Sequence, residues 1–332
     1  MDLIKIGKQL ASLRKEQGLT GEKLAEILNV SPQAVSKWEN GKCLPETALL
    51  PSLAKALDCT IDTLLMPNDK SCEDNDKVEA FYAIMNENDR LISQTKEFTR
   101  SKHIISRYLF NKKMEIADIG GGTGAYSFWL AEKGHDVHLF DLTPKHIEIA
   151  EQKAKIGGVA LCSYTCGDAR DLPYNDESMD LVLIMGPLYH FQSQESRLKC
   201  LTEAYRILKH GGHVICTVIG RYTALVTTLK HNLFHVFSTD TLEKLIKTGM
   251  SDAFNIVQAY AHTPSEIMAE LSSTGFENTH VVAVEGILNA FGDYSLPTDE
   301  KEAASLLKCI ELTETIPELM GVSRNLMAVG SK

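Results

Sequence analysis

A glycine-rich turn between an apolar run and an amphipathic segment constrains this chain more than any other feature. Residues 115–134 read EIADIGGGTGAYSFWLAEKG, where an apolar run suited to a buried strand leads into Gly120, Gly121, Gly122 and Gly124. Glycine allows a sharp turn and lets a ligand approach the backbone NH groups, and a helix N-terminus favours negative charge. The stretch therefore predicts a strand, a glycine turn and a helix beside a ligand.

The glycine spacing alone leaves more than one cofactor open. Gly120, Gly122 and Ala125 satisfy the G-x-G-x-x-G/A fingerprint of dinucleotide-binding proteins. The next expected strand, residues 136–140, ends at Asp141, a carboxylate placed to accept both hydroxyls of a ribose. Because several nucleoside cofactors contain a ribose, the downstream sequence has to decide between them.

Length and composition describe an ordinary globular chain. Its 332 residues predict roughly two domains, and 44% hydrophobic with 23% charged residues supplies a core. No apolar run approaches the roughly 18 residues of a membrane span, and the charged start is no signal peptide, so we expect a cytoplasmic protein without a membrane partner. The eight cysteines form no C-x-x-C pair, which favours reduced thiols and no metal site.

The net charge of -10 is unevenly distributed. Residues 1–67 hold eight basic and eight acidic side chains, so the rest of the chain carries the whole acidic excess. Nucleic-acid binding depends mainly on Lys and Arg that neutralise phosphates. The larger part of the chain is therefore unsuited to a general nucleic-acid surface.

Residues 4–65 read as five short helices. Thr20 and Ser31 are placed to cap the second and third, Pro32 suits a first helical position, and Asn29 tolerates the left-handed turn between them. The stretches LASLRKEQGLT, KLAEILNVSPQAVSKWENGK and LAKALDCTIDTLL resemble the Cro and phage-repressor (XRE-type) helix-turn-helix family. This resemblance implies an all-α DNA-binding domain over residues 1–66.

The resemblance also implies which residues contact DNA. In that family the third helix enters the major groove. The matching exposed positions are Gln33, Ser36, Lys37 and Asn40, with Lys42 near the backbone. Gly21 stands where the family usually has Gln, which removes a usual contact. We expect a homodimer reading an inverted repeat in operator DNA; the alternative is a helical domain kept for dimerisation or protein contact.

Residues 67–78 begin with Pro and a polar, acidic run, and are interpreted as an interdomain linker. The second domain is expected over 79–332, with a helical N-terminal cover up to about residue 112. Tyr82, Arg90 and Glu97 are candidates to close over a ligand there, although a packing helix explains most such residues.

Strand and helix patterns alternate after the glycine turn, which predicts an α/β doubly wound domain. ADIGGGTG, the strand end at Asp141, GDARDLPYNDESMDLVLI and AYRILKHGGHVICTV together resemble the class I S-adenosylmethionine-dependent methyltransferases, and GPLYHF at 186–191 resembles a bacterial small-molecule group among them. The resemblance implies a Rossmann-like domain with a mostly parallel seven-stranded sheet and S-adenosyl-L-methionine as cofactor. A dehydrogenase is not expected to carry both GDA and LKHGG.

The resemblance assigns cofactor roles residue by residue. Glycines border the methionine part, one carboxylate lies in its polar shell, a second holds the ribose, a loop reads the adenine, and the end of the fourth strand presents backbone to the amino acid moiety. The glycines are Gly120, Gly122 and Gly124, the polar-shell carboxylate is Asp118, and the ribose-binding carboxylate is Asp141. The adenine loop contains Asp168 and Ala169, and the end of the fourth strand contains Met185 and Gly186. A turn-forming role for Asp168 and a capping role for Asp118 are the alternatives.

The acceptor is expected to be a small molecule. A DNA cytosine C5 enzyme needs Pro-Cys, and no Pro here precedes Cys; amino-group DNA methylases carry Asn or Asp before Pro-Pro-aromatic, where this chain has Gly186-Pro187-Leu188. Tyr189 and His190 follow the fourth strand, where a general base would lie. For His190 a substrate-shaping or structural role is an equal alternative.

Residues 221–262 follow the fifth strand, are rich in His, Tyr, Phe and Thr, and are interpreted as a lid contributing Tyr222, His231 and His235. The sequence thus predicts an S-adenosylmethionine-dependent methyltransferase for a small molecule, joined to a DNA-binding domain that regulates its own or neighbouring genes. The alternative is a ligand-sensing repressor built on a non-catalytic methyltransferase fold.

Overall fold

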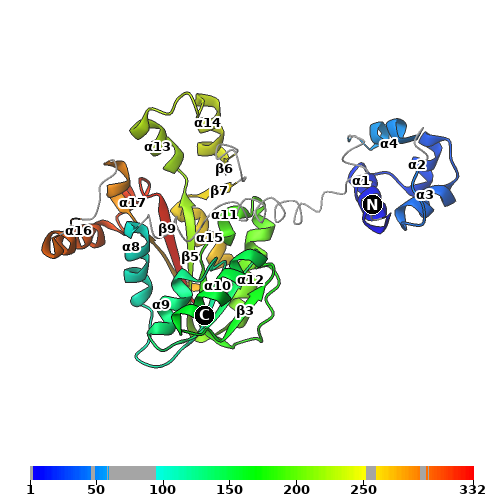
Figure 1. The fold of residues 1–332 in the computed structure, drawn as a ribbon. Helices are drawn as coiled ribbons and strands as arrows, with labels where there is room; N and C mark the ends of the chain where they lie inside the picture. Colours follow the sequence, from blue (N-terminus) through cyan, green and yellow to red (C-terminus); the bar gives the residue numbers. More distant parts are fainter. Residues whose placement is uncertain are drawn as a thin grey trace. The chain divides into compact units, whose positions relative to one another are not determined.

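A computed structural model describes residues 3–45, 49–57, 59, 95–251, 259–291, 297 and 299–332. The chain divides into two compact units, residues 1–73 and 74–332. Each unit is described by itself (Figure 1).

Short capped helices build the N-terminal unit. Its described helices are α1 (Leu3–Glu16), α2 (Gly21–Leu28), α3 (Pro32–Glu39) and α4 (Leu50–Ala56). The side chain of Thr20 accepts from Lys23 N at 3.1 Å and that of Ser31 from Ala34 N at 3.2 Å, which confirms both predicted caps. Asn29 ends α2 in the left-handed region, with φ of 53°. Its fully or largely buried core includes Leu10, Leu24, Val35, Trp38 and Leu53.

A mixed sheet forms the centre of the C-terminal unit. Its strands are β1 (Glu115–Ile119), β2 (Asp136–Asp141), β3 (Ser163–Cys166), β4 (Met179–Ile184), β5 (Leu208–Gly220), β6 (Met250–Ser251), β7 (Ala259–His262), β8 (Glu277–Ala283) and β9 (Asn325–Ser331). The first five are parallel in the order β3-β2-β1-β4-β5, and β9 pairs antiparallel with both β5 and β8.

The expected number of seven strands is corrected to nine among the described residues. The two additional strands, β6 and β7, are short and come from the segment 221–262. β7 pairs with the last two residues of β5, and β6 pairs antiparallel with β7. Strands of two and four residues carry too little alternating pattern to be recognised in a sequence.

Helices cover both faces of the sheet. The helices of this unit are α8 (Thr95–Ser106), α9 (Ala125–Glu132), α10 (Pro144–Gly157), α11 (Pro187–His190), α12 (Gln194–Ile207), α13 (Thr223–His231), α14 (Thr239–Thr248), α15 (Pro264–Ser273), the 3-10 helix η2 (Gly286–Ala290), α16 (Glu300–Thr313) and α17 (Pro317–Met320). Residues of α8, α9 and α10 pack on one face and residues of α11, α12 and α15 on the other. None of the described helices is both long and apolar enough to cross a membrane.

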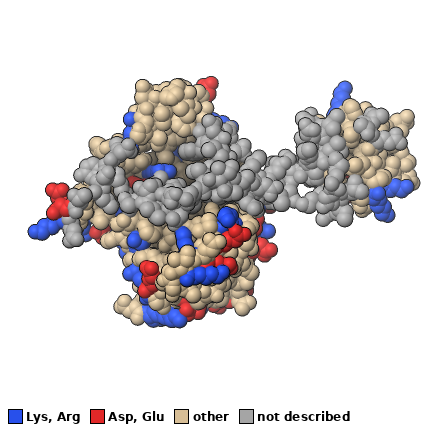
Figure 2. Space-filling view, in the orientation of Figure 1, with Lys and Arg blue, Asp and Glu red and all other residues tan. Residues whose placement is uncertain are grey.

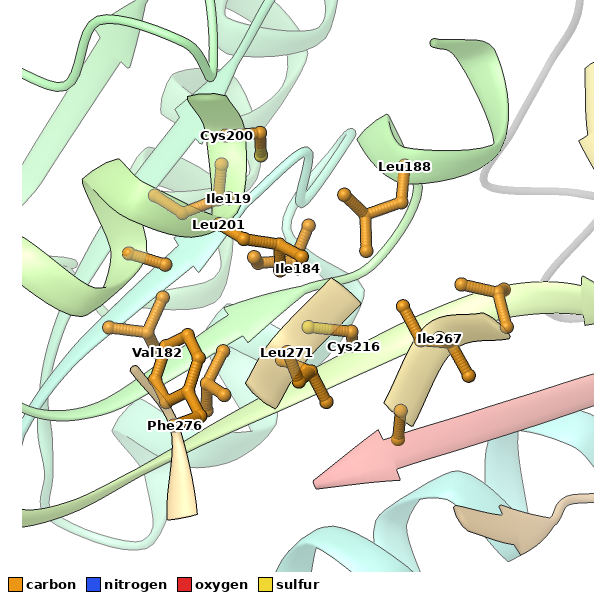
Figure 3. Packing of buried hydrophobic residues seen from close by; sticks show 14 of the residues in the cluster. Ile119, Val182, Ile184, Leu188, Cys200, Leu201, Cys216, Ile267, Leu271 and Phe276 are labelled. Atoms are coloured by element: carbon orange, nitrogen blue, oxygen red, sulfur yellow. The ribbon is translucent and has the colours of Figure 1, made fainter. Parts of the chain in front are cut away.

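The apolar run of β4 is buried on both faces, as a central parallel strand requires. Leu181 and Leu183 face one helical layer, and Val182 and Ile184 face the other. Figure 3 shows the second layer, where Leu201 of α12 and the α15 side chains lie over the strands.

A buried polar network ties the segment 221–262 to this layer. The Arg197 guanidinium pairs with the Glu270 carboxylate at 2.8 Å and lies over the Tyr260 ring, 3.7 Å from its centroid. His262 Nε2 lies 3.2 Å from Glu270 Oε2. At the start of the segment, Arg221 Nε donates to Ala261 O at 2.7 Å. Both ends of the segment are therefore held together at the sheet.

Replacing Glu270 by Ala is expected to lower the free energy of unfolding of the C-terminal unit by about 3 kcal/mol, because it leaves the buried Arg197 cation without its carboxylate. Glu243→Ala is the control, since Glu243 pairs with Lys247 on an exposed helix surface where ion pairs contribute less than about 1 kcal/mol. Urea titration of each variant measures both values. An equal loss of unfolding free energy in Glu270→Ala and Glu243→Ala would contradict a special role for the buried pair.

Candidate functional site

A cavity opens at the carboxyl ends of β1, β2 and β4, where open α/β sheets bind ligands. It holds about 690 Å³ of empty space, part of it open to solvent. Nine of the residues predicted for cofactor binding or catalysis line it: Gly120, Gly122, Asp141, Asp168, Ala169, Met185, Gly186, Tyr189 and His190. The fold therefore brings these nine residues together around one cavity, while their individual roles stay predictions.

The glycine turn brings backbone close to the cavity because side chains do not fit there. Gly120 and Gly122 have φ of 71° and 57°, a region that residues with a Cβ rarely adopt. A Cβ on Gly120 would lie 2.4 Å from Pro187 Cδ, at the start of α11. The turn can therefore present only backbone to a ligand.

The Asp141 carboxylate is fixed at the end of β2. Its Oδ2 accepts from Gly122 N at 2.8 Å, and its Oδ1 accepts from Thr143 N at 2.9 Å. His146 Nδ1 lies 3.0 Å from the same Oδ1 and also lines the cavity. The sequence analysis missed His146, although Thr143-Pro144 marks a helix start that puts residue 146 in the first turn.

Asp168 forms the turn that was one of its two predicted roles, and its contact with adenine stays a prediction. In the turn, Asp171 N donates to the Asp168 carbonyl oxygen at 3.0 Å, and the Asp168 side chain lines the cavity. Its carboxylate is bound by Arg170, whose Nε lies 2.9 Å from Oδ1. Arg170 is a second residue that the sequence analysis did not assign.

Tyr189 and His190 lie on α11 with ring centroids 4.6 Å apart. Burial lowers the pKa of His190 to about 4, so its imidazole is neutral near pH 7. A neutral imidazole can accept a proton, but its basicity falls with its pKa. His190 is therefore a weak base, and this environment suits shaping or hydrogen bonding at least as well.

Two predicted cofactor residues, Asp118 and Gly124, do not line the cavity. Asp118 precedes the last residue of β1, and its fully buried carboxylate accepts from Ser127 Oγ at 2.6 Å beneath the glycine turn. Gly124 begins α9 with φ of 83° and packs against Phe128. Both support the turn from below, and their predicted contacts with the cofactor stay a prediction.

The predicted lid residues are not brought to the cavity. Tyr222, His231 and His235 are exposed, and none of them lines it. Arg90 and Tyr82 lie outside the described residues. Their role in a lid therefore stays a prediction.

The predicted DNA-contact residues are exposed on one surface of the N-terminal unit. Gln33, Ser36, Lys37, Asn40 and Lys42 lie on α3 or just after it. Asn40 Nδ2 donates to Ser36 O at 2.7 Å. The α3 helix is held against α1 by a hydrogen bond from Arg14 Nε to Glu39 Oε1, 2.6 Å long.

Basic and acidic side chains are interspersed on the face of the C-terminal unit that Figure 2 shows, in the part formed by described residues. The described residues on that face form no broad basic surface of the kind a nucleic-acid backbone needs. Within the described ranges, His, Cys, Asp and Glu form no group of three that could hold a metal ion.

Asp118→Asn is expected to stabilise the C-terminal unit increasingly as pH rises. Burial raises the pKa of Asp118 to about 6, so the stability that its carboxyl contributes is present below about pH 4 and is lost as pH rises through about 6. Between about pH 5 and pH 8 the variant should gain about 1 kcal/mol on the wild type.

Urea titrations followed by Trp129 fluorescence, in a Trp38→Phe background, measure this difference. Asp136→Asn is the control, because the hydrogen bond from Lys113 lowers the pKa of Asp136 and its difference from the wild type should stay flat over that range. A flat difference for Asp118→Asn as well would contradict the raised pKa.

Comparisons with known proteins support a two-part chain. Residues 117–216 match the family model described as "Methyltransferase domain", and residues 10–64 match the model "Helix-turn-helix". The 2-methyl-6-phytyl-1,4-hydroquinone methyltransferase 2 of Oryza sativa subsp. japonica is 31% identical over 112 residues, which are 33% of this chain and 30% of that protein.

The ubiquinone/menaquinone biosynthesis C-methyltransferase UbiE of Ruegeria sp. (strain TM1040) is 27% identical over 49% of this chain and 66% of its own. The chain thus spans from under a third to just under two thirds of these relatives. A solved SAM-dependent methyltransferase from Methanosarcina mazei aligns with a TM-score of 0.49 and 20% identity, covering 69% of this chain and 96% of that one.

The motifs, the cavity and the two family matches agree. The chain joins an XRE-type helix-turn-helix domain to a class I S-adenosylmethionine-dependent methyltransferase domain.

Proposed function

We propose that this protein transfers a methyl group from S-adenosylmethionine to a small-molecule acceptor, and that its N-terminal domain binds operator DNA. The observation that carries the enzymatic part is the cavity itself. It brings the glycine backbone, Asp141 and Asp168 to one place, at the edge of the sheet where this family binds its cofactor.

The residues present fit that cofactor. Asp141 suits the two ribose hydroxyls, because a carboxylate accepts from two donors, and Asp168 offers a second carboxylate on the cavity wall, which we assign to the adenine amino group. Gly120, Gly122 and Gly186 leave room for the methionine part, since they present no side chain. The largely neutral His190 adds no positive charge beside a sulfonium.

The cofactor supplies an electrophilic methyl group on a sulfonium. The chain's contribution is to align that methyl with the acceptor and to exclude water. Holding the two reacting groups in line lowers the activation barrier, because they no longer have to meet by diffusion. Tyr189 and His190 line the cavity and are placed to orient an acceptor or hold its proton. The weak basicity of His190 favours an acceptor that needs little help in losing a proton.

Two relatives carry names that include a hydroquinone or a quinone, so hydroquinones are the first acceptors to test. The family match ends at residue 216, before the segment 221–262. Because that segment follows the cofactor fold directly and is proposed as the lid, the acceptor of this chain can differ from those of the relatives.

Calorimetry is expected to detect binding of S-adenosylhomocysteine and no binding of NADH. Gly120→Ala should weaken binding at least about tenfold, because its Cβ meets Pro187 and the left-handed backbone disfavours a side chain by about 1–2 kcal/mol. Gly134→Ala is the matched control: it has φ of 91°, nothing within 4 Å of its Cβ, and no place in the cavity.

NADH binding without S-adenosylhomocysteine binding would overturn the proposal. Transfer of labelled methyl to hydroquinones or to other metabolites then tests catalysis directly. Cofactor binding without transfer to any acceptor would support the ligand-sensing repressor instead.

The DNA-binding part rests on the exposed surface of α3. Two copies reading an inverted repeat would give the affinity that a single short domain lacks. Joining such a domain to an enzyme allows the protein to regulate its own or neighbouring genes. If cofactor occupancy controls operator affinity, operator DNA must change cofactor affinity by the same factor.

Selection from random DNA with the full-length protein is expected to give inverted repeats. Gln33→Ala should weaken binding to the selected sequence about tenfold or more while leaving random DNA unaffected, because an amide side chain recognises a base edge. Lys55→Ala, on the exposed side of α4, is the control and should change binding to the selected sequence and to random DNA by the same factor. Recovery of no preferred sequence would contradict operator binding.

A further inference from the structure

We propose that Arg170 is a positioning residue that makes the cavity select a purine with a 6-amino group. It does so by holding the Asp168 carboxylate as a fixed anion. The inference rests on the proposed cofactor binding and adds a determinant that no sequence motif assigned.

Arg170 binds the Asp168 carboxylate from one side with several donors. Its backbone N and its Nε each lie 2.9 Å from Oδ1, Nε also lies 3.1 Å from Oδ2, and Nη2 lies 2.5 Å from Oδ2. A planar guanidinium that contacts both oxygens fixes the plane of a carboxylate, which a single ammonium cannot do. The orientation of Asp168 is therefore set by its neighbour two residues away.

Arg170 is itself held in place. Its Nη1 donates to Ser196 Oγ at 3.2 Å, in the first turn of α12. Its guanidinium lies over the Phe191 ring, 4.9 Å from the centroid, and Phe191 is buried and lines the cavity. The ion pair is thus braced between α12 and a wall of the cavity.

The exposure of the two partners shows which one meets the ligand. The Arg170 side chain is 8% exposed, whereas that of Asp168 is 29% exposed. Asp168 lines the cavity and Arg170 does not. The carboxylate therefore keeps an accessible edge toward the ligand, with the guanidinium behind it.

This arrangement decides which ligand edge is accepted. A guanidinium stays protonated, so the carboxylate beside it is an acceptor without a proton to donate. The 6-amino group of adenine donates to such an acceptor. A 6-oxo group, as in hypoxanthine, would point its lone pairs at an anion, which is a repulsive contact that disfavours the wrong ligand.

The test compares S-adenosylhomocysteine with S-inosylhomocysteine, which carries a 6-oxo group, by calorimetry on the full-length protein. The wild type should prefer the adenosyl compound at least about tenfold. Arg170→Met should reduce this preference about tenfold, because the carboxylate is then free to turn. Arg170→Lys keeps the charge and loses the planar contact, so its preference for the adenosyl compound should lie between those of the wild type and of Arg170→Met.

Arg206→Met is the matched control. Arg206 also contacts a nearby carboxylate, with Nη2 2.8 Å from Glu203 Oε2, but it does not line the cavity. Its removal should leave the preference unchanged. If Arg170 only stabilised the loop, its replacement would lower the affinities for S-adenosylhomocysteine and S-inosylhomocysteine by the same factor, and the ratio of the two would not change.

The outcomes separate the two proposals. No binding of S-adenosylhomocysteine to the wild type would overturn the proposed function and this inference with it. Binding with a preference that Arg170→Met and Arg170→Lys both retain would overturn the inference alone. If Arg170→Met does not fold by circular dichroism, Arg170→Lys decides, and an unchanged preference there counts against the role of Arg170.

Discussion

The hydrogen bond from Gly122 N to Asp141 Oδ2 joins the ends of two neighbouring strands, and the rest of the cavity depends on it. β1 and β2 are paired up to Ile119 and Phe140. Beyond that point Gly120 N still donates to Phe140 O, at 2.7 Å, although the chain has left the strand. The donors of the turn are therefore satisfied by the end of β2, and the turn and the carboxylate form one unit.

Burial controls protonation around this unit. It raises the pKa of Asp118 beneath the turn and lowers that of His190 beside the cavity. In both cases the neutral form is favoured, because burial disfavours charge. Asp141 and Asp168 are carboxylates held by several donors instead. The cavity thus concentrates its charge where hydrogen-bond donors surround it.

Local sequence patterns were sufficient to predict the order of the main strands and helices, the glycine turn and the positions of Asp141 and Asp168. They could not show where side chains point in the folded chain. Asp118 was expected in the polar shell of the cofactor, and the fold adds a hydrogen bond from Ser127 Oγ to its carboxylate that the motif did not indicate. Arg170 and His146 were visible in the motifs, yet their roles depend on contacts with Phe191 and Asp141 that only the fold creates.

The anchoring of residues 221–262 at both ends has an evolutionary consequence. Arg221 and Tyr260 hold the two ends of this segment beside the same buried pair, Arg197 and Glu270, outside the glycine turn and Asp141. Among the described residues between the anchors, Phe237, Leu242 and Leu245 pack in a hydrophobic cluster of their own, separate from the two clusters that flank the sheet beside the cavity. Substitutions on the exposed surface of this part are therefore expected to leave the nucleoside pocket undisturbed. Evolution can in this sense vary that surface while the two ends of the segment stay fixed.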